Sequence, residues 1–372
     1  MCEGFGENGP SRNPELLGLS CIQCSQWWQL GDYMQGCSLC WQTGTPSNLR
    51  CVYLRESSRL QLPYTSPVTL GEGRSPLVSV PNHEGLFALL EGSNPTGSHK
   101  DRYSAQAISH ALVSGYDRIL AASSGNAGLS IAAYAARADL RCEVVITADV
   151  PLALQRAIED TGATIHLARD GPARWAYIRE AVARDPQGTL SLTNTAVPVV
   201  GSSAFGIEGY KTVALNILEA LGRTPDHVIV PTSRGDLVWG TWLGFVELSH
   251  FAGTGLPRMH CVEPFPRVSA VLRHQRPQSD FFSGDAGSLV SIGGDSVTFQ
   301  TVAAVEQSKG SAAVVRPVDA EYSCGWLRRH GFLVEASSAA ALAAYVQLSA
   351  RRLIAPGALS VLVLTSHMFK GI

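Results

Sequence analysis

The sequence predicts an α/β fold in which parallel strands alternate with helices, preceded by an extension that carries paired cysteines. From about residue 66 onward, short apolar runs alternate with amphipathic stretches, and turn residues separate them. Alternation of this kind indicates a parallel sheet whose two faces are both covered by helices. The 372 residues, 45% of them hydrophobic, are enough to bury the cores of about two domains and to leave an extension.

Six apolar runs predict strands, and six amphipathic stretches predict helices. The candidate strands are 118–122, 143–148, 164–168, 227–232, 259–263 and 359–365. The candidate helices carry helix-forming residues with apolar spacings of three and four: 105–114, 127–138, 152–161, 173–184, 206–221 and 338–351. The short connections favour parallel neighbouring strands. Residues 278–294 are rich in Ser, Gly and Asp, and we expect them to form a surface loop.

Charge and hydropathy argue against two kinds of partner. The net charge is −2 and the pI is about 6.6, which leaves no basic face for a phosphodiester backbone. No run of about 18 apolar residues could cross a bilayer. Residues 1–18 contain neither a basic leader nor an apolar signal core. We therefore expect a cytoplasmic protein in a reducing compartment, with no nucleic-acid and no membrane partner.

Four of the nine cysteines form a repeated motif in the extension. Cys21 and Cys24 make one C-x-x-C, and Cys37 and Cys40 make a second after twelve intervening residues. Four thiolates with this spacing can bind Zn²⁺ tetrahedrally and fold a segment too short to have its own core. Reduced cysteine pairs or a redox C-x-x-C are alternatives, and the doubled motif argues against both. We expect a zinc-ribbon-like segment at 21–40, with a structural zinc, in an extension that covers residues 1–65.

Lys100 is the residue with the most informative chemical setting. It is one of only four lysines, and a turn-forming Asn-Pro-Thr-Gly-Ser-His stretch leads through it into an Ala-rich helix. The positive pole of a helix N-terminus lowers the pKa of an amine and so favours its neutral, nucleophilic form. Such an amine can bond to an aldehyde and later act as a general base. Taken alone, the segment also fits a surface lysine beside a helix start.

A second candidate site is the turn at 123–128, which follows a predicted strand and opens a predicted helix. Its sequence, Ser-Ser-Gly-Asn-Ala-Gly, lets backbone amides approach a carboxylate or a phosphate. Many α/β crossovers contain such a turn, and a nucleotide site is an equally good interpretation of it. The G-x-G-x-x-G dinucleotide fingerprint is absent from it.

Several motifs, in the same order along the chain, resemble those of the threonine synthase family. They are GEGRSPL at 71–77, NPTGSHKDR at 94–102, SSGNAG at 123–128, EGYKT at 208–212 with PDHVIVP at 225–231, and LTSHMFK at 364–370. The corresponding family segments read GEGxTPL, NPTGSFKDR, SSGNAG, the run into the phosphate loop, and LTGHGLK. An N-terminal ribbon also occurs in many threonine synthases. The resemblance covers nearly the whole chain.

This resemblance implies a pyridoxal-phosphate enzyme with the two-domain tryptophan-synthase-β-like fold, also called fold type II. The small α/β domain would cover residues 104–210. The large cofactor-binding domain would combine 66–103 with 211–372, and the cofactor would lie in the cleft between the two. The implied substrate is a small-molecule amino acid, and homodimers are common for such folds.

The resemblance also implies roles for individual residues. Lys100 would hold the cofactor and move protons, Asn126 would contact its 3-hydroxyl, and Thr365 would face the pyridine nitrogen. A neutral hydroxyl there leaves the nitrogen unprotonated and makes the ring a weaker electron sink. The substrate carboxylate would bind at Ser124, Gly125, Asn126 and Ala127, and the cofactor phosphate at Ser233, Arg234, Gly235, Asp236 and Leu237. Glu335 resembles a residue that lines the family's site, and a helix-capping carboxylate is the alternative.

Three departures from the family bear on the substrate. The phosphate loop reads Ser-Arg-Gly-Asp-Leu where the family has GNGGN, and Arg234 could contact the phosphate or point to solvent. His99 replaces the usual aromatic residue, and Ser-His-Met-Phe at 366–369 replaces Gly-His-Gly-Leu.

The implied reaction converts O-phosphohomoserine to threonine and phosphate by γ-elimination and β-addition of water. The alternative is a paralogue that performs β- or γ-elimination or replacement on another activated amino acid, such as a lyase or dehydratase of specialised amino-acid metabolism. A catalytically silent scaffold predicts loss of Lys100 or Thr365, and both are present. A nucleotide-dependent oxidoreductase would require the missing dinucleotide fingerprint.

Overall fold

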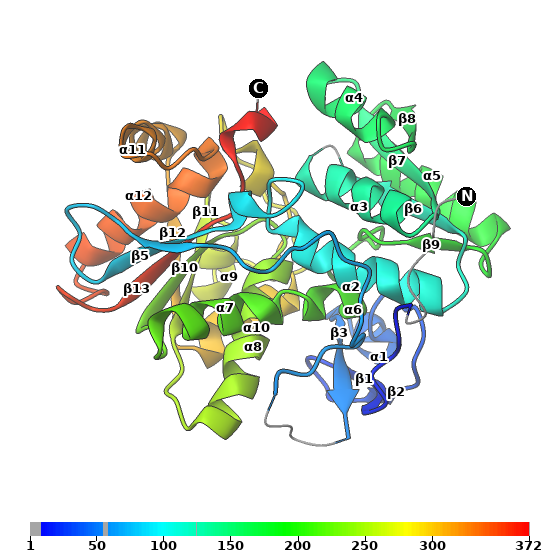
Figure 1. Ribbon diagram of the computed structural model, residues 1–372, viewed down its shortest axis with the longest axis horizontal. Helices are drawn as coiled ribbons and strands as arrows, with labels where there is room; N and C mark the ends of the chain where they lie inside the picture. Colours follow the sequence, from blue (N-terminus) through cyan, green and yellow to red (C-terminus); the bar gives the residue numbers. More distant parts are fainter. Residues whose placement is uncertain (1–8, 55–58, 124, 372) are drawn as a thin grey trace.

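The structure is a computed structural model, which describes residues 9–54, 59–123 and 125–371. The described strands form three sheets of six, four and three strands. Figure 1 shows the two larger sheets in separate lobes, with the three-stranded sheet of the N-terminal extension below the lobe of the four-stranded sheet. Among the described residues, no helix is both long and apolar enough to cross a membrane.

The six-stranded sheet has the order β12-β11-β10-β13-β5-β4. Neighbouring strands are parallel, except that β4 pairs antiparallel with β5. In the register, Ile229 of β10 lies opposite His260 of β11 and Leu362 of β13. The strands are β4 (Leu77–Ser79), β5 (Leu86–Leu90), β10 (His227–Pro231), β11 (Arg258–Glu263), β12 (Ser311–Val314) and β13 (Ser360–Leu364).

Helices cover both faces of this sheet. Ile229 and Leu362 belong to the hydrophobic cluster on the side of α12 (Ala336–Ala350) and α11 (Pro317–Arg329). Val228 and Val361 belong to the cluster on the opposite side. Burial on both faces explains why these strands are apolar runs without alternation. The helices of the second side are α7 (Lys211–Leu221), α8 (Asp236–Ala252), α9 (Val268–Leu272) and α10 (Phe299–Gln307).

The four-stranded sheet has the order β8-β7-β6-β9, and all of its strand pairs are parallel. Ile119 and Ala121 pack toward α3 (Asn126–Arg137) and α2 (Lys100–Val113), whereas Leu120 and Ala122 pack toward α5 (Gly171–Arg184). The elements that complete the lobe are β6 (Arg118–Ala122), β7 (Arg141–Thr147), α4 (Leu152–Glu159), β8 (Thr164–Ala168) and β9 (Thr189–Ser191).

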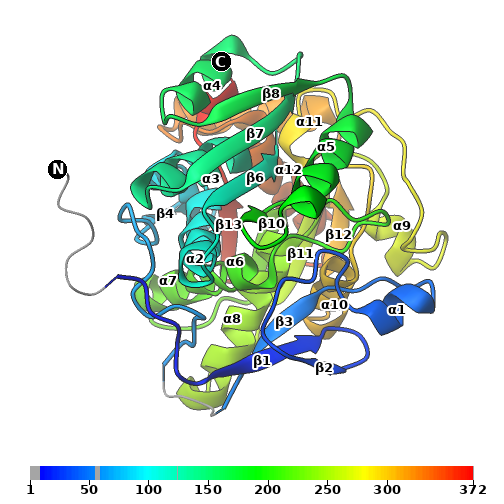
Figure 2. The same cartoon turned by 90° about the vertical axis from the view of Figure 1, so that its right-hand side faces the viewer.

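The extension is an antiparallel sheet that packs against helices of the main body. It contains β1 (Leu16–Cys21), β2 (Trp27–Trp28), α1 (Ser38–Gln42) and β3 (Leu49–Tyr53). Figure 2 shows it beneath α6 (Ala204–Glu208). The ring of His110 in α2 stacks on Phe205 of α6 at a centroid distance of 3.8 Å, and Asp32 of the extension accepts a hydrogen bond from that imidazole.

All twelve predicted elements are present, most with ends shifted by one or two residues. Two differences are larger. Helix α2 begins at Lys100, five residues before its predicted start. The single helix predicted at 206–221 is divided into α6 and α7, because Gly209 and Tyr210 donate short-turn hydrogen bonds to the carbonyls three residues earlier, each at 3.0 Å. Residues 278–294 contain only the 3₁₀ turn Val290–Ile292, in agreement with the predicted loop.

Candidate active site

The segments predicted to form the site all follow the carboxyl ends of parallel strands. Thr365 directly follows β13, residues 233–237 follow β10, and residues 124–127 follow β6. Lys100 follows β5 after a 3₁₀ turn at Glu91–Ser93. In open α/β sheets ligands bind at this edge of the strands. Three of these segments therefore share one edge of the six-stranded sheet, and residues 125–127 follow a strand of the four-stranded sheet in the other lobe.

Lys100 is the first residue of α2 and is half-buried. Its Nζ lies 5.8 Å from the centre of the Tyr210 ring, and Tyr210 is fully buried. Burial lowers the pKa of Lys100; the negative charge of Asp236 acts against this shift, and the positive charge of Arg234 adds to it. The net effect is a pKa below that of an ordinary lysine, which favours the neutral amine needed for bonding to an aldehyde.

A buried ion pair anchors the segment that carries Lys100. The guanidinium of Arg102 donates to both oxygens of Glu91, from Nε at 2.8 Å and from Nη2 at 2.6 Å, and both side chains are fully buried. One residue earlier, Asp101 accepts from the backbone N–H of Thr96 at 2.7 Å and from the Ser130 hydroxyl at 2.6 Å. Since Ser130 belongs to α3, Asp101 also fixes the lysine segment relative to the 123–128 turn.

Thr365 lies directly beside the lysine segment. The backbone N–H of His99 donates to the carbonyl of Thr365 at 3.0 Å, and the His99 Nδ1 lies 3.1 Å from the same oxygen. Ser98 and Ser366 form an antiparallel bridge next to it. The hydroxyl of Thr365 is 2.8 Å from the Ser338 hydroxyl, and Thr365 is only 4% exposed. The structure thus joins the motifs at 94–102 and 364–370.

The loop at 233–237 is held from behind by α10 and by Arg267. The hydroxyls of Thr298 and Thr301 donate to the carbonyl of Arg234 at 2.8 and 3.2 Å. Arg267 donates to the carbonyls of Thr232 and Ser233. Gly235 has a φ of +77°, and a Cβ at this position would lie 1.7 Å from the Thr301 hydroxyl oxygen. Only glycine allows this close approach, and α8 begins at the next residue.

Arg234 has the features of an anion ligand. Its Nε is buried and has no hydrogen-bond partner among the residues that the structure describes. The guanidinium carbon lies 5.3 Å from the Trp175 ring centre, so the side chain reaches from the large sheet to α5 of the other lobe. Burial lowers its pKa, and the charges of Asp236 and Asp295 partly offset this effect. A partly buried cation whose buried Nε is an unused donor is suited to a phosphate group.

The other predicted residues of this loop differ in which of their groups a ligand could reach. The Ser233 side chain is partly exposed, whereas Leu237 packs in the hydrophobic core, so that only its backbone is available to a ligand. The carboxylate of Asp236 accepts hydrogen bonds from Gln300 Nε2 and, at 3.4 Å, from the backbone N–H of Ser202.

On the facing lobe, α3 begins at Asn126. Gly125, Asn126 and Ala127 are partly exposed at this helix start, where the first backbone N–H groups of a helix favour an anion. The N–H of Gly125 also points to the Ser123 hydroxyl, at 3.4 Å. Ser124 lies outside the described residues. Glu335 occupies the N-cap position of α12, but its side chain makes no capping hydrogen bond there.

Several residues of the site region were not predicted as such. Five of them contact a predicted site residue or its neighbour: Glu91, Arg102, Ser338, Tyr210 and Gln300. The available signal was positional: Arg102 stands two residues after Lys100, and Ser338 stands three residues after Glu335. Tyr210 stands within the EGYKT motif at 208–212, whereas Gln300 carried no local signal.

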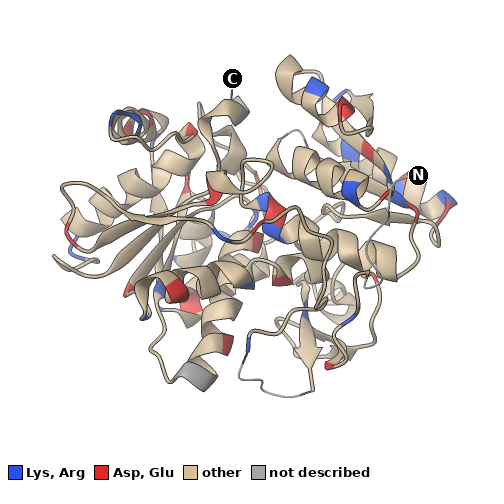
Figure 3. Ribbon diagram, in the orientation of Figure 1, with Lys and Arg blue, Asp and Glu red and all other residues tan. Residues whose placement is uncertain are grey.

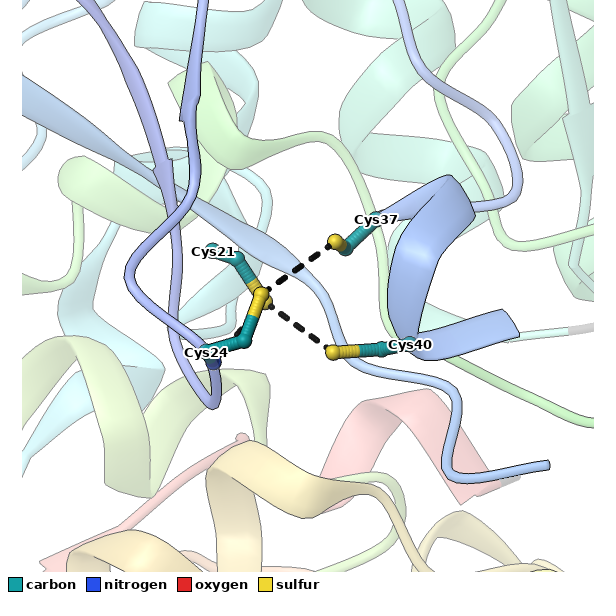
Figure 4. Close-up of side chains that lie close together, drawn as sticks. All are labelled: Cys21, Cys24, Cys37 and Cys40. Carbon is teal, nitrogen blue, oxygen red and sulfur yellow. Dashed lines mark hydrogen bonds between the residues drawn. The ribbon is translucent and has the colours of Figure 1, made fainter. Parts of the chain in front are cut away.

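The four cysteines of the extension converge. Their Sγ atoms all lie within 4.8 Å of one another (Figure 4). The Cys21 and Cys40 sulfurs are 3.6 Å apart, and those of Cys24 and Cys37 are 3.7 Å apart. A tetrahedral site with Zn–S bonds of about 2.3 Å places its sulfurs about 3.8 Å apart. The donor set therefore fits a tetrahedral, thiolate-bound metal.

The residues predicted to form the active site likewise fit pyridoxal phosphate. The cofactor needs an amine for its aldehyde, an anion site for its phosphate, and a partner for its ring nitrogen. Lys100 supplies an amine of lowered pKa, Arg234 a partly buried cation with an unused donor, and Thr365 a buried hydroxyl.

In the view of Figure 3, basic and acidic residues are interspersed rather than gathered on one face.

Comparison with known proteins gives the class. Residues 68–366 match the family described as pyridoxal-phosphate dependent enzyme. The chain belongs to this family, and its cofactor is pyridoxal phosphate. Two curated relatives are the threonine synthases of Halalkalibacterium halodurans and Mycobacterium tuberculosis. The first is 31% identical over 319 residues, which cover 82% of this chain and 85% of that protein. The second is 31% identical over 316 residues, 82% of this chain and 84% of that protein.

Solved structures agree on the fold. The processed form of threonine deaminase isoform 2 from Solanum lycopersicum has a TM-score of 0.67 at 17% identity, covering 79% of this chain and 84% of that one. Serine racemase from Dictyostelium discoideum has a TM-score of 0.64 at 18% identity, covering 79% and 92%. The chain is thus an α/β enzyme of fold type II and a pyridoxal-phosphate-dependent lyase.

Proposed function

We propose that this enzyme converts O-phosphohomoserine and water into threonine and phosphate. The proposal rests mainly on the contact between the two motifs that most resemble those of threonine synthases. Lys100, at the start of α2, lies beside Thr365, because the neighbouring residue His99 makes two contacts with the Thr365 carbonyl. Relatives named threonine synthase, at 31% identity over 82% of the chain, support the same substrate.

The reaction requires two proton removals and one bond cleavage on the carbon chain. Protons leave Cα and Cβ, the Cγ–O bond to phosphate breaks, and the hydroxyl of water adds at Cβ while protons return to Cα and Cγ. Bound pyridoxal phosphate supplies an electron sink for the charge that develops at Cα. Lys100 acts as the general base, because its lowered pKa favours the neutral amine, which can accept these protons.

The remaining residues bind and orient. The backbone N–H groups at the start of α3, from Gly125 to Ala127, bind the substrate carboxylate, and the Asn126 side chain contacts the cofactor 3-hydroxyl. Arg234 and the backbone of 233–237 bind the cofactor phosphate. The Thr365 hydroxyl, held by Ser338, faces the ring nitrogen.

A second candidate is elimination or replacement on another activated amino acid. The observation in its favour is His99, whose ring is bonded to Thr365 directly beside the lysine, where threonine synthases have a different aromatic residue. A polar ring at this place changes what the substrate side chain meets.

Absorbance of the purified protein with pyridoxal phosphate, followed by titration with O-phosphohomoserine, tests the proposal. We expect a visible band that is lost in Lys100→Ala and kept in Lys309→Ala, a matched change at an exposed lysine. Phosphate and threonine should then appear together. A band without turnover of this substrate would favour the second candidate, and absence of the band would overturn the assignment of Lys100.

We also propose that Cys21, Cys24, Cys37 and Cys40 bind a structural Zn²⁺ and make the extension a zinc ribbon. The sulfur separations of 3.6 and 3.7 Å support this, as does the closed set of four thiolates, which leaves no position for a substrate. The domain boundaries given above, a homodimer and a cytoplasmic location stay predictions.

A further inference from the structure

A buried chain of hydrogen bonds runs from the extension to the proposed phosphate loop. The side-chain Nδ2 of Asn48 donates to the Gln300 Oε1 at 3.2 Å, and Gln300 Nε2 donates in turn to Asp236 Oδ1 at 2.5 Å. All three side chains are less than 9% exposed. Asp236 is the first residue of α8 and follows Gly235 of the loop. This relay of Asn48, Gln300 and Asp236 therefore joins residue 48 to a loop almost two hundred residues later.

The extension end of this relay is fixed by the cysteine-bearing turns. The backbone N–H of Ile22, next to Cys21, donates to the carbonyl of Asn48 at 3.1 Å, and the N–H of Cys37 donates to the carbonyl of Ser47 at 2.9 Å. Asn48 Oδ1 accepts from the N–H of Leu49 at 2.9 Å. These three bonds set the backbone and the side chain of Asn48, so its position depends on the fold of both cysteine turns.

The three side chains of the relay also pack closely against Gly201. Gly201 has a φ of +123°, and a Cβ there would lie 2.7 Å from Asn48 Nδ2, 2.7 Å from Gln300 Nε2 and 3.1 Å from Asp236 Oδ1. The Nδ2 of Asn48 donates a second bond, to the carbonyl of Ser202 at 3.0 Å, and the Ser202 N–H points to Asp236 Oδ1. The three side chains thus pack together over residues 201–202.

We propose that Asn48 is a positioning residue through which the extension controls the affinity of the enzyme for pyridoxal phosphate. The inference rests on the proposed phosphate site at 233–237. A carboxylate at the start of α8 would repel the cofactor phosphate if its side chain turned toward the loop. Two donors on Asp236 Oδ1 hold the carboxylate on the side of Gln300 and Ser202 and offset part of its charge. Asn48 holds Gln300 in the orientation that donates.

The test compares Asn48→Ser with Asn13→Ser, because the two asparagines are closely matched. Both belong to the extension, are buried to within 6% exposure, and accept a backbone N–H on Oδ1 at 2.9 Å. Asn13 Nδ2 also donates two bonds, to Gln61 Oε1 and the Leu62 carbonyl, but neither partner lies in the loop. The measurement is the dissociation constant of pyridoxal phosphate, by absorbance titration of the cofactor-free protein, together with its thermal midpoint.

We expect Asn48→Ser to raise the dissociation constant about five- to tenfold and Asn13→Ser to change it less than twofold, with similar losses of thermal stability. At saturating pyridoxal phosphate, turnover of Asn48→Ser should return to that of the wild type. Equal dissociation constants for the two variants would overturn the inference. Failure of the wild-type protein to take up the cofactor at Lys100 would instead overturn the proposed site.

Gln300→Met provides a second arm of the test, at the middle residue of the relay. It removes both hydrogen-bonding groups at similar length, and we expect it to weaken pyridoxal phosphate binding at least as much as Asn48→Ser. In a double-mutant cycle, adding Asn48→Ser to Gln300→Met should change the dissociation constant less than twofold, since the relay is already broken. Full additivity of the two changes would show that Asn48 does not act through Gln300.

Discussion

At the scale of single residues, burial and two opposite charges set the pKa of the reactive amine. Burial lowers the pKa of Lys100, Asp236 raises it, and Arg234 lowers it further. The neutral amine is the form that bonds to an aldehyde, so the rate of this bonding rises with pH until the pH exceeds the pKa. Because the pKa lies below the ordinary lysine value, the rise is complete at a lower pH than for an exposed lysine.

Removing either charge should therefore move the pH profile in a known direction. We expect Asp236→Asn to shift the midpoint to lower pH and Arg234→Gln to shift it to higher pH. Stopped-flow absorbance with pyridoxal, which lacks the phosphate, separates this effect from phosphate binding. Shifts of the same sign in both variants would contradict the electrostatic account.

A hydroxyl pair sets the proposed contact to the ring nitrogen. Thr365→Val keeps the shape of the side chain but leaves Ser338 without its 2.8 Å partner. We expect turnover to fall about 10- to 100-fold and the visible band of the bound cofactor to move, because a hydrogen bond to the ring is lost. Thr365→Ser should restore both properties.

The control for this change is Thr241→Val. Thr241 is also fully buried, and its hydroxyl has no hydrogen-bond partner within the described part of the chain. Turnover and spectrum should match the wild type. An equal loss in the two valine variants would assign the effect to packing rather than to the ring nitrogen.

At the scale of elements, helix α8 begins and ends at left-handed glycines with different surroundings. Gly235 has a φ of +77° and Gly253 a φ of +60°. A Cβ at Gly235 would overlap Thr301, whereas a Cβ at Gly253 would meet nothing within 4 Å. At both glycines an alanine would therefore be strained by the left-handed backbone, but only at Gly235, in the loop, would its Cβ also clash with a neighbour.

Gly235→Ala should thus weaken pyridoxal phosphate binding at least tenfold, because the loop must move away from Thr301. Gly253→Ala should cost only about 1 kcal/mol in the free energy of unfolding and leave cofactor affinity unchanged. Titration with pyridoxal phosphate and urea unfolding measure the two quantities. Equal cofactor affinities in both variants would show that the loop does not depend on this close approach.

At the scale of the whole molecule, helix α2 connects the extension to the active site. Its first residue is Lys100, and near its other end His110 Nε2 lies 2.9 Å from Asp32 of the extension. The other ring nitrogen of His110 is 2.8 Å from the Tyr64 hydroxyl. The extension therefore packs on the same helix that carries the reactive amine, in addition to the Asn48 contact with α10.

Removal of the proposed zinc should lower both the thermal stability of the protein and its affinity for pyridoxal phosphate. We expect a strong chelator, or Cys24→Ser, to abolish metal binding, to lower the thermal midpoint by about 5 to 10 °C, and to weaken pyridoxal phosphate binding. Elemental analysis should find one Zn²⁺ per chain in the wild type and in Cys142→Ser, a buried cysteine outside the cluster. A metal-free protein with unchanged stability and affinity would contradict a structural role.

Much of the fold was predictable because its signals are local. The central strands of the two larger sheets, such as β6, β10 and β13, are apolar runs buried on both faces. Strands β6 and β8 begin and end where predicted. Helix α8 was not predicted, since it is apolar on all sides and shows no amphipathic spacing. Strand β12, only four residues long, likewise lacks a distinct pattern.

Local motifs also indicated the reactive residues. Lys100, the 233–237 loop and Thr365 each follow a strand of the six-stranded sheet, and the carboxyl ends of parallel strands meet at one edge of a sheet, so their convergence follows from the strand pattern. Asn126 follows β6 of the four-stranded sheet, so its position relative to them depends on how the two lobes pack. The four cysteines were predictable for a similar reason, because two short turns place their ligands close together.

Tertiary packing alone decided which distant side chains support these residues. Arg102 pairs with Glu91, Thr365 with Ser338, and Asn48 with Gln300, which lies 252 residues away. A side-chain hydrogen bond requires its two atoms to lie within about 3.5 Å, and no local pattern specifies that distance between separate elements. Sequence periodicity determines which face of an element is buried, whereas the packing of complete elements determines which partner meets it there.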